Sequence, residues 1–327
     1  MKKITIKEVA EEAGVSKTTI SRFLNNNYGN MSIETKNRIA EVIQRLNYRP
    51  SRQAQALKSK HSYLIGVVVA DISNLYSSLL LKGIGSILEE QGYQMIIVDA
   101  ANSVAQETEL LEKLLDQNVE GIILQPSSRQ SENYTFITER HTPLLLVDRQ
   151  TEPEKWSSVM TNNIAATQEL IERALAKGYE NVVVVSEPIK EANTRELRYQ
   201  TVKKTTVKAG KECQLVELTA KTQLAELLKP LLTNSKKSLL FAANGRVLME
   251  TLAWLIEEEI NVPAELGITG FDDWNLTALV GPGITSIEQP SKKIGEIAAE
   301  HLLELLKEPQ ARQEIIVPST IQWRNSI

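Results

Sequence analysis

Five polar residues in one short stretch have a spacing that suits contact with nucleic acid. Lys17, Thr18, Ser21, Arg22 and Asn25 recur at helical intervals, so they would share one face of a helix. That face would carry hydrogen-bond donors and acceptors, two of them positively charged, and no large apolar side chain. Such groups can contact phosphates and base edges in the major groove of DNA.

Two short helices joined by a tight turn would position this face. Thr5 and Glu8 have the spacing of a capping box for a first helix, and Gly14 can supply the left-handed residue that ends it. Ser16 can cap a second helix that runs to about Asn25. We count the two N-cap residues, Thr5 and Ser16, among the candidate DNA contacts. A small helical bundle with a polar outer face would show a similar pattern.

A third helix and a short linker follow. Ser32 can cap a helix whose Ile39, Val42, Ile43 and Leu46 form one apolar stripe, which would close a three-helix core. Pro50 would end that helix, and Ser51 could cap a further short helix that ends near residue 57. A helix of this length is unstable alone, so we expect it to order only on DNA.

These motifs together resemble the lactose/galactose repressor (LacI/GalR) family of bacterial transcription factors. The matching segments are VAEEAGVSKTTISRFLN at 9–25, NYRP at 47–50 and AQAL at 54–57. The resemblance implies a homodimer that binds a pseudo-palindromic operator in double-stranded DNA, and it adds Tyr48 to the candidate contacts. It also implies that Leu57 inserts into the minor groove, while the small Ala54 lets two hinge helices pack together. An ordinary polar linker is the alternative for this segment.

Charge is distributed unevenly along the 327 residues. Residues 1–60 contain 12 Lys and Arg and 5 Asp and Glu, a net charge of +7, whereas the rest carries 25 and 36, a net charge of −11. A basic head on an acidic body is the expected distribution for a DNA-binding module attached to a sensor. Because no apolar run approaches the length of a membrane span and no signal sequence precedes the first helix, we expect a cytoplasmic protein.

Beyond about residue 62, short apolar runs alternate with amphipathic helical stretches. This alternation predicts an α/β body of two doubly wound parallel-sheet lobes, similar to periplasmic sugar-binding proteins. The apolar runs lie at 63–70, 94–100, 121–126, 143–148, 181–186, 238–244, 266–272 and 314–318. The helical stretches lie at 75–91, 105–117, 164–177, 195–209, 222–232, 245–259 and 291–307.

We therefore expect three parts. They are a helix-turn-helix domain of three helices at 1–49, a hinge helix and linker at 50–61, and an effector-binding and dimerisation domain at 62–327. Within the domain at 62–327, the family resemblance implies that the chain enters a second lobe and then returns to the first. The N-lobe would contain about 62–160 and 291–318, and the C-lobe about 161–290 and 319–327.

Polar residues that follow the apolar runs are the candidate effector ligands, because ligands of open α/β sheets bind at the carboxyl ends of strands. Next to two of these candidates the sequence departs from the family pattern. After Asn74, Leu75 replaces the proline of D-I-x-N-P-F, and after Asn244, Gly245 replaces the aspartate of A-N-D. The ring of Tyr76 could stack on a sugar. The candidates that follow apolar runs are Asp71, Asn74, Tyr76, Arg149, Asn244 and Asp272. The resemblance adds Arg195, which matches an arginine that clamps the effector in relatives.

Carboxylates and amides beside planar arginines suit a polyhydroxy ligand. Arg149 and Arg195 together favour an anionic one, so the effector could be a sugar, a sugar acid or a sugar phosphate. No enzyme signature accompanies these residues: the three histidines are scattered, Cys213 is the single cysteine, and no phosphate-binding loop is present. We expect no cofactor and no metal.

The sequence thus predicts a ligand-responsive, sequence-specific transcriptional regulator, most simply a repressor of sugar or sugar-acid catabolism genes. The alternative is a sugar-binding protein without a DNA function, against which the basic head argues.

Overall fold

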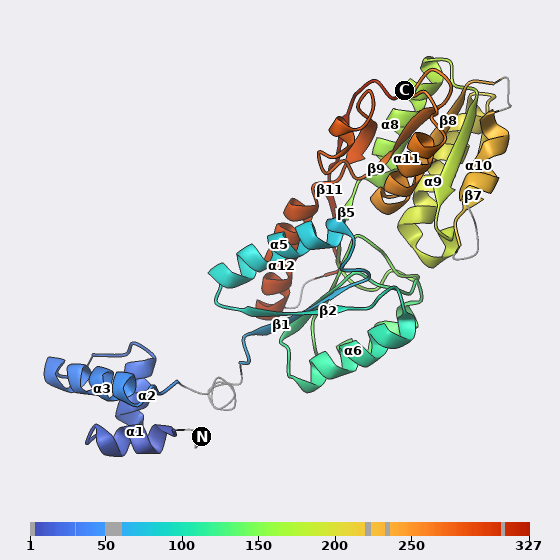
Figure 1. Cartoon of the computed structure of the whole chain (residues 1–327). Helices are drawn as coiled ribbons and strands as arrows, with labels where there is room; N and C mark the ends of the chain where they lie inside the picture. The colour runs from blue at the N-terminus through green and yellow to red at the C-terminus, as the bar shows by residue number, and fades with distance from the viewer. Residues whose placement is uncertain (1–3, 30, 50–60, 220–223, 233–235, 309–310) are drawn as a thin grey trace. The chain divides into compact units, whose positions relative to one another are not determined.

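The computed structural model describes residues 4–29, 31–49, 61–219, 224–232, 236–308 and 311–327. The chain forms two compact units, Met1–Tyr63 and Leu64–Ile327, which Figure 1 shows in blue and in cyan to red. The predicted hinge residues Ser51, Ala54 and Leu57 lie outside the described residues, so their roles stay predictions.

The first unit contains three helices around a small core. These are α1 (Ile6–Glu12), α2 (Lys17–Leu24) and α3 (Ile33–Arg45). Each begins at its predicted cap: the side chains of Thr5, Ser16 and Ser32 accept hydrogen bonds from backbone N–H groups in the first turn, and Thr5 with Glu8 completes the capping box. Gly14 has a φ of 61°, the left-handed conformation expected after α1. The fully buried core residues of this unit are Val9, Ala10, Ala13, Ile20, Ile39 and Val42.

The second unit holds two six-stranded sheets, each the centre of one lobe. The N-lobe sheet has the order β11-β5-β4-β3-β1-β2 and is parallel throughout. Its strands are β1 (Leu64–Val69), β2 (Gln94–Asp99), β3 (Gly121–Leu124), β4 (Leu144–Val147), β5 (Ser158–Thr161) and β11 (Glu314–Val317).

The C-lobe sheet has the order β12-β10-β9-β8-β6-β7. It is parallel except for the edge strand β12, which runs antiparallel to β10. Its strands are β6 (Asn181–Ser186), β7 (Glu212–Glu217), β8 (Ser238–Ala242), β9 (Gly267–Phe271), β10 (Thr285–Glu288) and β12 (Thr320–Gln322). The predicted fold class, a helix-turn-helix domain with a doubly wound α/β body, is confirmed.

Helices cover both faces of each sheet. In the N-lobe, α5 (Leu75–Glu90) and α12 (Ser291–Lys307) pack on one face, and α6 (Val104–Asp116) and α7 (Thr135–Glu139) on the other. In the C-lobe, α10 (Leu224–Leu232) and α11 (Gly245–Glu257) cover one face, and α8 (Asn163–Ala176) and α9 (Asn193–Lys208) the other. This double coverage explains why the central strands are apolar on both sides.

Helices α5 and α12 approach closely because each contributes a glycine to the contact. A Cβ atom at Gly83 would lie 2.0 Å from the Lys292 carbonyl oxygen, and one at Gly295 would lie 2.2 Å from the Leu80 carbonyl oxygen. The G-I-G sequence at 83–85 is therefore a helix-packing feature. It joins a helix from the start of the body to one near its end.

The chain passes between the two sheets three times, after β5, after β10 and after β11. Two of these crossings are bonded to each other: the Asn162 side-chain oxygen accepts a hydrogen bond of 2.8 Å from the Ser319 N–H, and the Thr161 hydroxyl donates to the Val317 carbonyl at 3.1 Å. A body with neighbouring crossings of this kind can bend there and change the spacing of its lobes.

Candidate DNA-binding surface and effector pocket

The second helix of the first unit presents the polar face that the sequence predicts. Lys17, Thr18, Arg22 and Asn25 are exposed, and Ser21 is half-buried. On the opposite side Ile20 is buried in the core. Asn25 is the C-cap residue of α2, so it lies at the end of the same face. The exposed residues of α2 can therefore reach a DNA groove without any rearrangement of the core.

Three other candidate DNA contacts are engaged within the first unit. The Thr5 hydroxyl bonds with Glu8, and the Ser16 hydroxyl accepts from the Thr19 N–H at 3.1 Å. Tyr48 is half-buried against the three-helix core, and burial raises the pKa of its hydroxyl. These residues shape the surface, whereas Lys17, Thr18 and Arg22 have side chains that are open to solvent.

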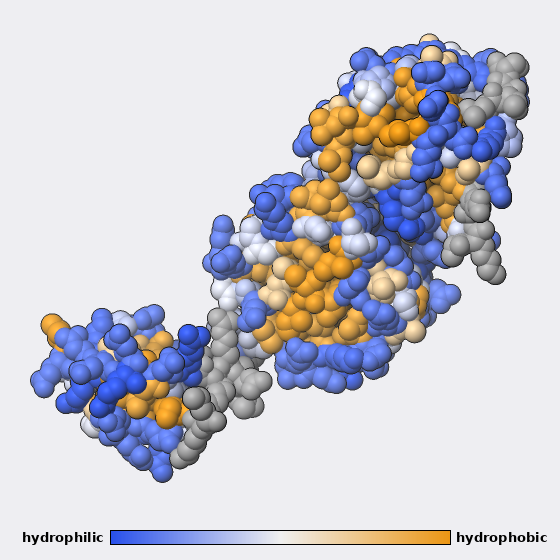
Figure 2. Space-filling model, viewed as in Figure 1, coloured by the Kyte–Doolittle hydropathy of each residue, from blue (hydrophilic) through white to orange (hydrophobic). Residues whose placement is uncertain are grey.

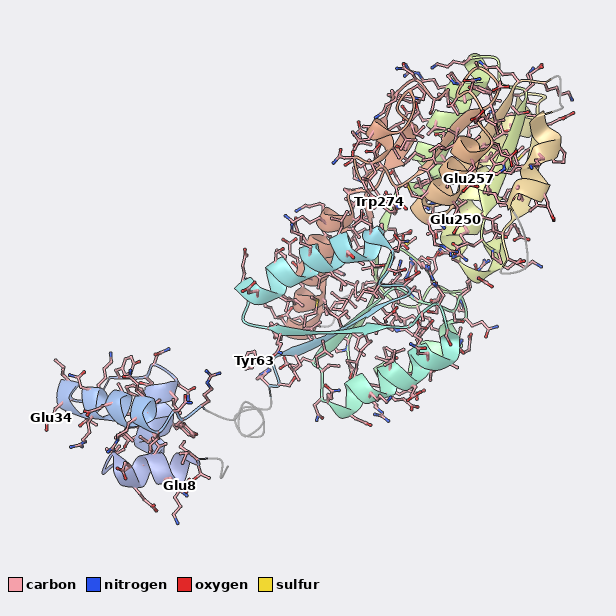
Figure 3. All side chains as sticks on the ribbon, in the orientation of Figure 1. Glu8, Glu34, Tyr63, Glu250, Glu257 and Trp274 are labelled. Carbon is pink, nitrogen blue, oxygen red and sulfur yellow. The ribbon has the colours of Figure 1, made fainter. Side chains whose placement is uncertain are left out.

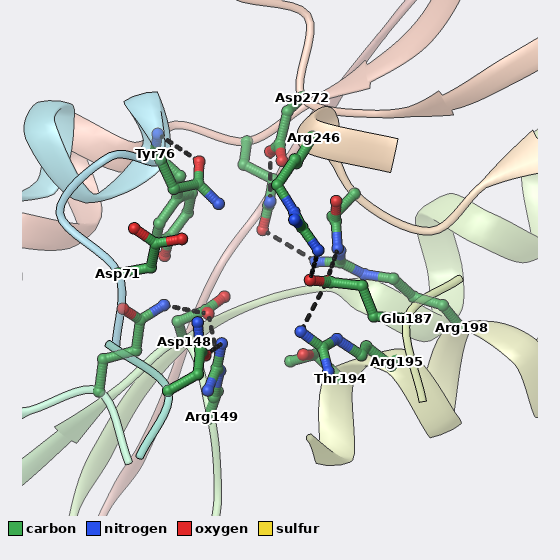
Figure 4. A pocket seen from close by; sticks show the side chains of 15 residues that line it. Asp71, Tyr76, Asp148, Arg149, Glu187, Thr194, Arg195, Arg198, Arg246 and Asp272 are labelled. Atoms are coloured by element: carbon green, nitrogen blue, oxygen red, sulfur yellow. Dashed lines mark hydrogen bonds and ion pairs between the residues drawn. The ribbon is translucent and has the colours of Figure 1, made fainter. Parts of the chain in front are cut away.

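All seven candidate effector ligands line one pocket in the second unit. Figure 4 shows this pocket from close by, with side chains entering from both lobes. The residues that line it are Asp71, Asn74, Tyr76, Asn102, Gln125, Asp148, Arg149, Glu187, Thr194, Arg195, Arg198, Asn244, Arg246, Asp272 and Gln289. Strand ends of two separate sheets are thus brought together, as the sequence predicts. Figure 2 shows hydrophilic surface where the two lobes meet.

Each lobe contributes a buried aspartate held by a glutamine. Asp148 follows β4 with a φ of 63°, and Asp272 follows β9 with a φ of 71°. Gln125 donates to Asp148 at 2.7 Å, and Gln289 donates to Asp272 at 2.6 Å. Left-handed backbone at a residue other than glycine is strained and is found at functional sites. The two lobes therefore present matching carboxylates to the pocket.

Arg198 is the deepest cation of the pocket, and the sequence prediction missed it. The residue is 3% exposed, and its guanidinium donates to Asn163 at 2.8 Å and to the Ala243 carbonyl at 2.6 Å and lies 3.5 Å from the centre of the Phe271 ring. Burial lowers its pKa, and the charges of Asp272 and Asp148 oppose that shift. For Asp272 burial has the opposite effect and raises the pKa of the carboxyl group, and the charge of Arg198 opposes this rise.

Arg195, which was predicted, is paired within the protein. It donates to Glu187 at 2.6 Å and to Glu191 at 3.3 Å. Glu187 was not predicted, because it follows β6 in a sequence without a recognised motif. The spacing of Arg195 and Arg198 at i and i+3 could have revealed the second arginine, since both lie on one face of α9.

Tyr76 differs from its predicted role. Its ring is 3% exposed and packs in the N-lobe core, so it does not offer a free face for stacking on a sugar. Its hydroxyl, by contrast, is buried and has no hydrogen-bond partner among the described residues. Burial, reinforced by the charges of Asp148 and Asp272, raises its pKa well above the ordinary value. The hydroxyl is the part of Tyr76 that suits contact with a ligand.

Three other candidates come from the N-lobe, and two of them, Asp71 and Asn74, shape the first loop of the pocket. A side-chain oxygen of Asp71 accepts from the Ser73 N–H at 2.9 Å, which forms a tight turn. Asn74 caps α5 by accepting from the Tyr76 N–H at 3.0 Å. Arg149 donates to the Pro126 carbonyl at 3.2 Å and to the Asn102 side-chain oxygen at 3.4 Å, while its Nε lies 3.9 Å from Asp148.

On the C-lobe side, Asn244 caps α11 by accepting from the Val247 N–H at 3.0 Å. The next residue, Gly245, donates its N–H to Asp272 at 2.9 Å. A Cβ atom at Gly245 would lie 2.1 Å from the indole ring of Trp274. The departure from the A-N-D pattern therefore has a local reason, because an aspartate could not fit beside this ring. Trp274 also packs against the N-lobe core, and Figure 3 shows it where the lobes meet.

Within the part of the chain that the structure describes, no cluster of three or more His, Cys, Asp or Glu side chains could hold a metal ion. The same residues form no helix that is long and apolar enough to cross a membrane.

A three-helix unit with an exposed polar second helix, followed by a two-lobed α/β body, defines the class of helix-turn-helix proteins with a periplasmic-binding-protein-like body. Residues 5–51 match the family described as "Bacterial regulatory proteins, lacI family", and residues 171–327 match the "Periplasmic binding protein-like domain". The chain is 35% identical over 331 residues to the HTH-type transcriptional regulator KdgR of Bacillus subtilis, covering 99% of this chain and 97% of that one.

The chain therefore belongs to the lacI family of bacterial regulatory proteins, as its motifs predict. It is a DNA-binding transcriptional regulator. It is also 33% identical to the HTH-type transcriptional regulator PtxS of Pseudomonas putida, over 93% of this chain and 90% of that one.

Solved structures agree on the fold. A crystal structure of the Lac repressor dimer bound to operator and an anti-inducer matches with a TM-score of 0.86 at 21% identity, covering 99% of each chain. A LacI transcriptional regulator from Lactobacillus brevis matches with a TM-score of 0.71 at 28% identity, covering 80% of this chain and all of the other.

Proposed function

We propose that this regulator is a homodimeric repressor whose operator affinity is controlled by a polyhydroxy effector bound in the pocket between the lobes. The observation that carries the proposal is the pocket itself: four arginines and four carboxylates from both lobes converge on it beside the buried Tyr76 hydroxyl. Hydroxyl groups of a sugar-like ligand can donate to the carboxylates and accept from the arginines. Within this proposal the protein acts by binding and not by catalysis.

On the DNA side, we assign base selection to Lys17 and Thr18, and a base or phosphate contact to Arg22. Their exposure on α2 supports the assignment. Ser21 and Asn25 would add contacts on the same face. The hinge helix would lie in the minor groove, with Ser51 and Ala54 among its DNA contacts, and Leu57 would be the wedge that the family resemblance implies. Since these contacts require DNA, the protein would work in the cytoplasm.

A dimer is supported by apolar side chains exposed on the second unit. Apolar surface of this kind usually marks a protein contact, and Figure 2 shows orange, hydrophobic surface over the N-lobe. Among the large apolar residues that are exposed are Ile72, Leu75, Ile97, Met249, Leu276 and Leu279. Two copies would place two α2 helices on the two halves of a pseudo-palindromic operator. The similar Lac repressor structure is likewise a dimer bound to operator.

The domain limits belong to this proposal. They are 1–49 for DNA binding, 50–61 for the hinge and 62–327 for effector binding and dimerisation. Ligand closure of the two lobes would change the distance between the two hinge segments of a dimer, and this change would alter operator affinity.

The DNA-binding arm is tested by selecting operator fragments from genomic DNA and titrating them in gel shifts at several salt concentrations. We expect a sequence-preferring complex. Substitution Lys17→Ala or Arg22→Ala should weaken it and, where the residue contacts phosphate, reduce the slope of log affinity against log salt by about 1. Absence of any sequence-preferring complex at moderate salt would sink the proposal.

The effector arm is tested by thermal-shift screening of sugars and sugar acids, with every hit repeated in the gel shift. A compound that binds the pocket should raise the melting temperature and change operator affinity. A hit that binds equally well after Arg198→Met would show that the pocket is not the effector site.

A further inference from the structure

We propose that Glu187 selects the charge of the effector, so that the pocket accepts a polyhydroxy ligand with one negative charge and rejects one with two. This inference rests on the proposed function, in which the pocket binds the effector. It excludes sugar phosphates and sugar diacids, and it singles out sugar monoacids.

The carboxylate of Glu187 already occupies an anion position inside the pocket. Its Oε2 accepts from Arg195 at 2.6 Å and from the Asn244 amide at 2.8 Å, and its Oε1 accepts from Arg246. Its side chain is 14% exposed. Figure 4 shows Glu187 between these donors. Two guanidinium groups and an amide form the kind of donor set that would hold the carboxylate of a ligand. Here the protein supplies that carboxylate itself.

Glu187 carries its negative charge at neutral pH. Burial would raise the pKa of its carboxyl group, but the charges of Arg195 and Arg246 outweigh burial and lower it below the ordinary value. The strongest donors of Arg195 and Arg246 are therefore satisfied before any ligand arrives. An incoming anion gains little from these two residues unless it displaces a carboxylate that is already well bound.

Arg149 is the guanidinium whose terminal nitrogens remain for a ligand. They meet uncharged oxygens, of Pro126 and Asn102, at 3.2 and 3.4 Å, and the nearest carboxylate, that of Asp148, lies 3.9 Å from its Nε. Arg149 also lies near Arg195, which comes from the other lobe: burial lowers the pKa of Arg195, and the positive charge of Arg149 lowers it further. A single carboxylate beside Arg149 would relieve this repulsion, and it would draw the two lobes together.

A second negative charge has no comparable position. The rest of the pocket presents the carboxylates of Asp71, Asp148 and Asp272 beside the buried Arg198, whose positive charge Asp272 and Asp148 already stabilise. These acids suit hydroxyl groups, which donate hydrogen bonds, and they repel anions. The charges thus match a ligand with one acidic end and an uncharged polyol remainder.

The test compares ligands that share a carbon skeleton and differ in charge. For the gluco, galacto and manno skeletons we would titrate the neutral hexose, the hexonate and the hexarate into the full-length protein by isothermal titration calorimetry. In the wild type, a hexonate should bind more tightly than the hexose and the hexarate of its own skeleton. This part uses no variant and does not depend on folding of a mutant.

Two substitutions should shift the preference in opposite directions. Glu187→Gln removes the carboxylate that Arg195 and Arg246 share inside the pocket and leaves them only the exposed acidic partners Glu191 and Glu250, so the hexarate should gain roughly tenfold or more over the hexonate. Arg246→Gln removes a cation, so the neutral hexose should gain over the hexonate. That gain should be smaller, about threefold, because the Arg246 side chain is 53% exposed. The double variant restores the original charge and should return the preference to the hexonate.

Glu191→Gln is the matched control. Glu191 also pairs with Arg195, at 3.3 Å, but its side chain is 65% exposed and it does not line the pocket. Its removal should leave the charge preference unchanged. Thermal unfolding and the hexonate titration would show that each variant is folded.

The possible outcomes separate the inference from its premise. A wild type that binds a neutral hexose or a hexarate most tightly overturns the charge rule and leaves the effector pocket in place. A Glu187→Gln variant with unchanged preference, or an equal change in Glu191→Gln, overturns the role of Glu187. A wild type that binds no compound of any charge overturns the effector pocket, and the inference fails with it.

Discussion

At position 245 a glycine makes room for an indole ring. The backbone there is the first turn of α11 and has no positive φ, so the need for glycine is steric: an added Cβ would lie 2.1 Å from the Trp274 ring. Gly245→Ala should cost about 1–3 kcal/mol of unfolding free energy, because the ring must move. Chemical denaturation would measure this cost.

The contact can be isolated by a double-mutant cycle. In a Trp274→Leu background the penalty of Gly245→Ala should largely disappear. Gly85→Ala is the matched control, because a Cβ there has its nearest neighbour at 3.5 Å, and this change should be neutral or stabilising. A penalty at 245 that persists without the indole would contradict the steric explanation.

Asp273 gives the body a stability that depends on pH. Its carboxylate is buried, accepts from the hydroxyls of Thr277 at 2.6 Å and Ser286 at 2.7 Å, and pairs with Arg324. Burial would raise its pKa, but the hydrogen bonds from Arg324 and the two hydroxyls lower it to about 2. Since the pKa of an unfolded aspartate is about 3.9, the stabilisation is complete above that pH and is lost as the pH falls toward 2.

We therefore predict a shallower acid response when this pair is removed. From about pH 5 to about pH 3, the wild type should lose about 1 kcal/mol more unfolding free energy than the double variant Asp273→Asn/Arg324→Met. Urea denaturation at each pH provides the measurement. Replacing both partners avoids a buried unpaired cation. Parallel losses in the two proteins would assign the acid response to other carboxylates.

At the scale of the element, helix α2 separates residues that build the helix from residues that can read DNA. The Ser16 hydroxyl caps α2, whereas the Thr18 side chain is exposed on it. Ser16→Ala should lower the stability of the first unit by about 1 kcal/mol and weaken binding to all DNA sequences alike. Thr18→Ala should leave stability unchanged and alter the preferred operator sequence. Selection of operator variants, together with thermal unfolding, distinguishes the two; a sequence change caused by Ser16→Ala would reverse the assignment.

The elements that could be predicted are those with a strong period or a cap. Helices α1 to α3 begin at the predicted residues because Thr5, Ser16 and Ser32 stand directly before a helical apolar pattern, where a hydroxyl side chain can accept a hydrogen bond from the first turn. Strands β5, β7, β10 and β12 are absent from the apolar runs by which the other strands are predicted. Their sequences SVMT, ECQLVE, TSIE and TIQ are short or polar, and β7 and β12 lie at sheet edges, where solvent replaces one neighbour.

The residues of the pocket likewise divide into those that could be predicted from the sequence and those that could not. Strand ends are visible in the sequence, so residues that follow apolar runs, such as Asp71 and Asp272, were found. Glu187 and Arg198 were missed because their importance depends on which side chain pairs with which across the fold. Arg195 alone looks like a free cation in the sequence, and only the structure places a carboxylate on it.

At the scale of the whole body, a contact between the lobes can tune how tightly the effector is held. Arg129 of the N-lobe pairs with Glu152 in its own lobe and with Glu196 on α9 of the C-lobe. Nearby, the Gln150 N–H donates to Asn193 of the C-lobe at 3.0 Å. Closed lobes are therefore favoured by one partly exposed ion pair and one buried hydrogen bond.

Glu196→Gln should weaken effector binding about two- to fivefold without changing which ligand is preferred, since a partly exposed pair contributes at most about 1 kcal/mol. Glu152→Gln is the matched control, because it removes a partner of Arg129 within one lobe and should change affinity less. Calorimetry with the best-binding hexonate measures both. Equal effects of the two substitutions would show that the pair across the lobes has no special role in closure.

The three crossings between the sheets also impose an order on synthesis. The N-lobe contains β1 near its start, yet its edge strand β11 and the long helix α12, which packs on α5 through Gly83 and Gly295, lie near the end of the chain. A ribosome that makes this protein therefore releases the whole C-lobe sequence up to β10 before the N-lobe can cover one face of its sheet. Until residues 291–317 emerge, the apolar side chains of α5 and β1 that later face α12 remain uncovered. The growing chain thus passes through a period of exposure to aggregation, when chaperones would have most to protect.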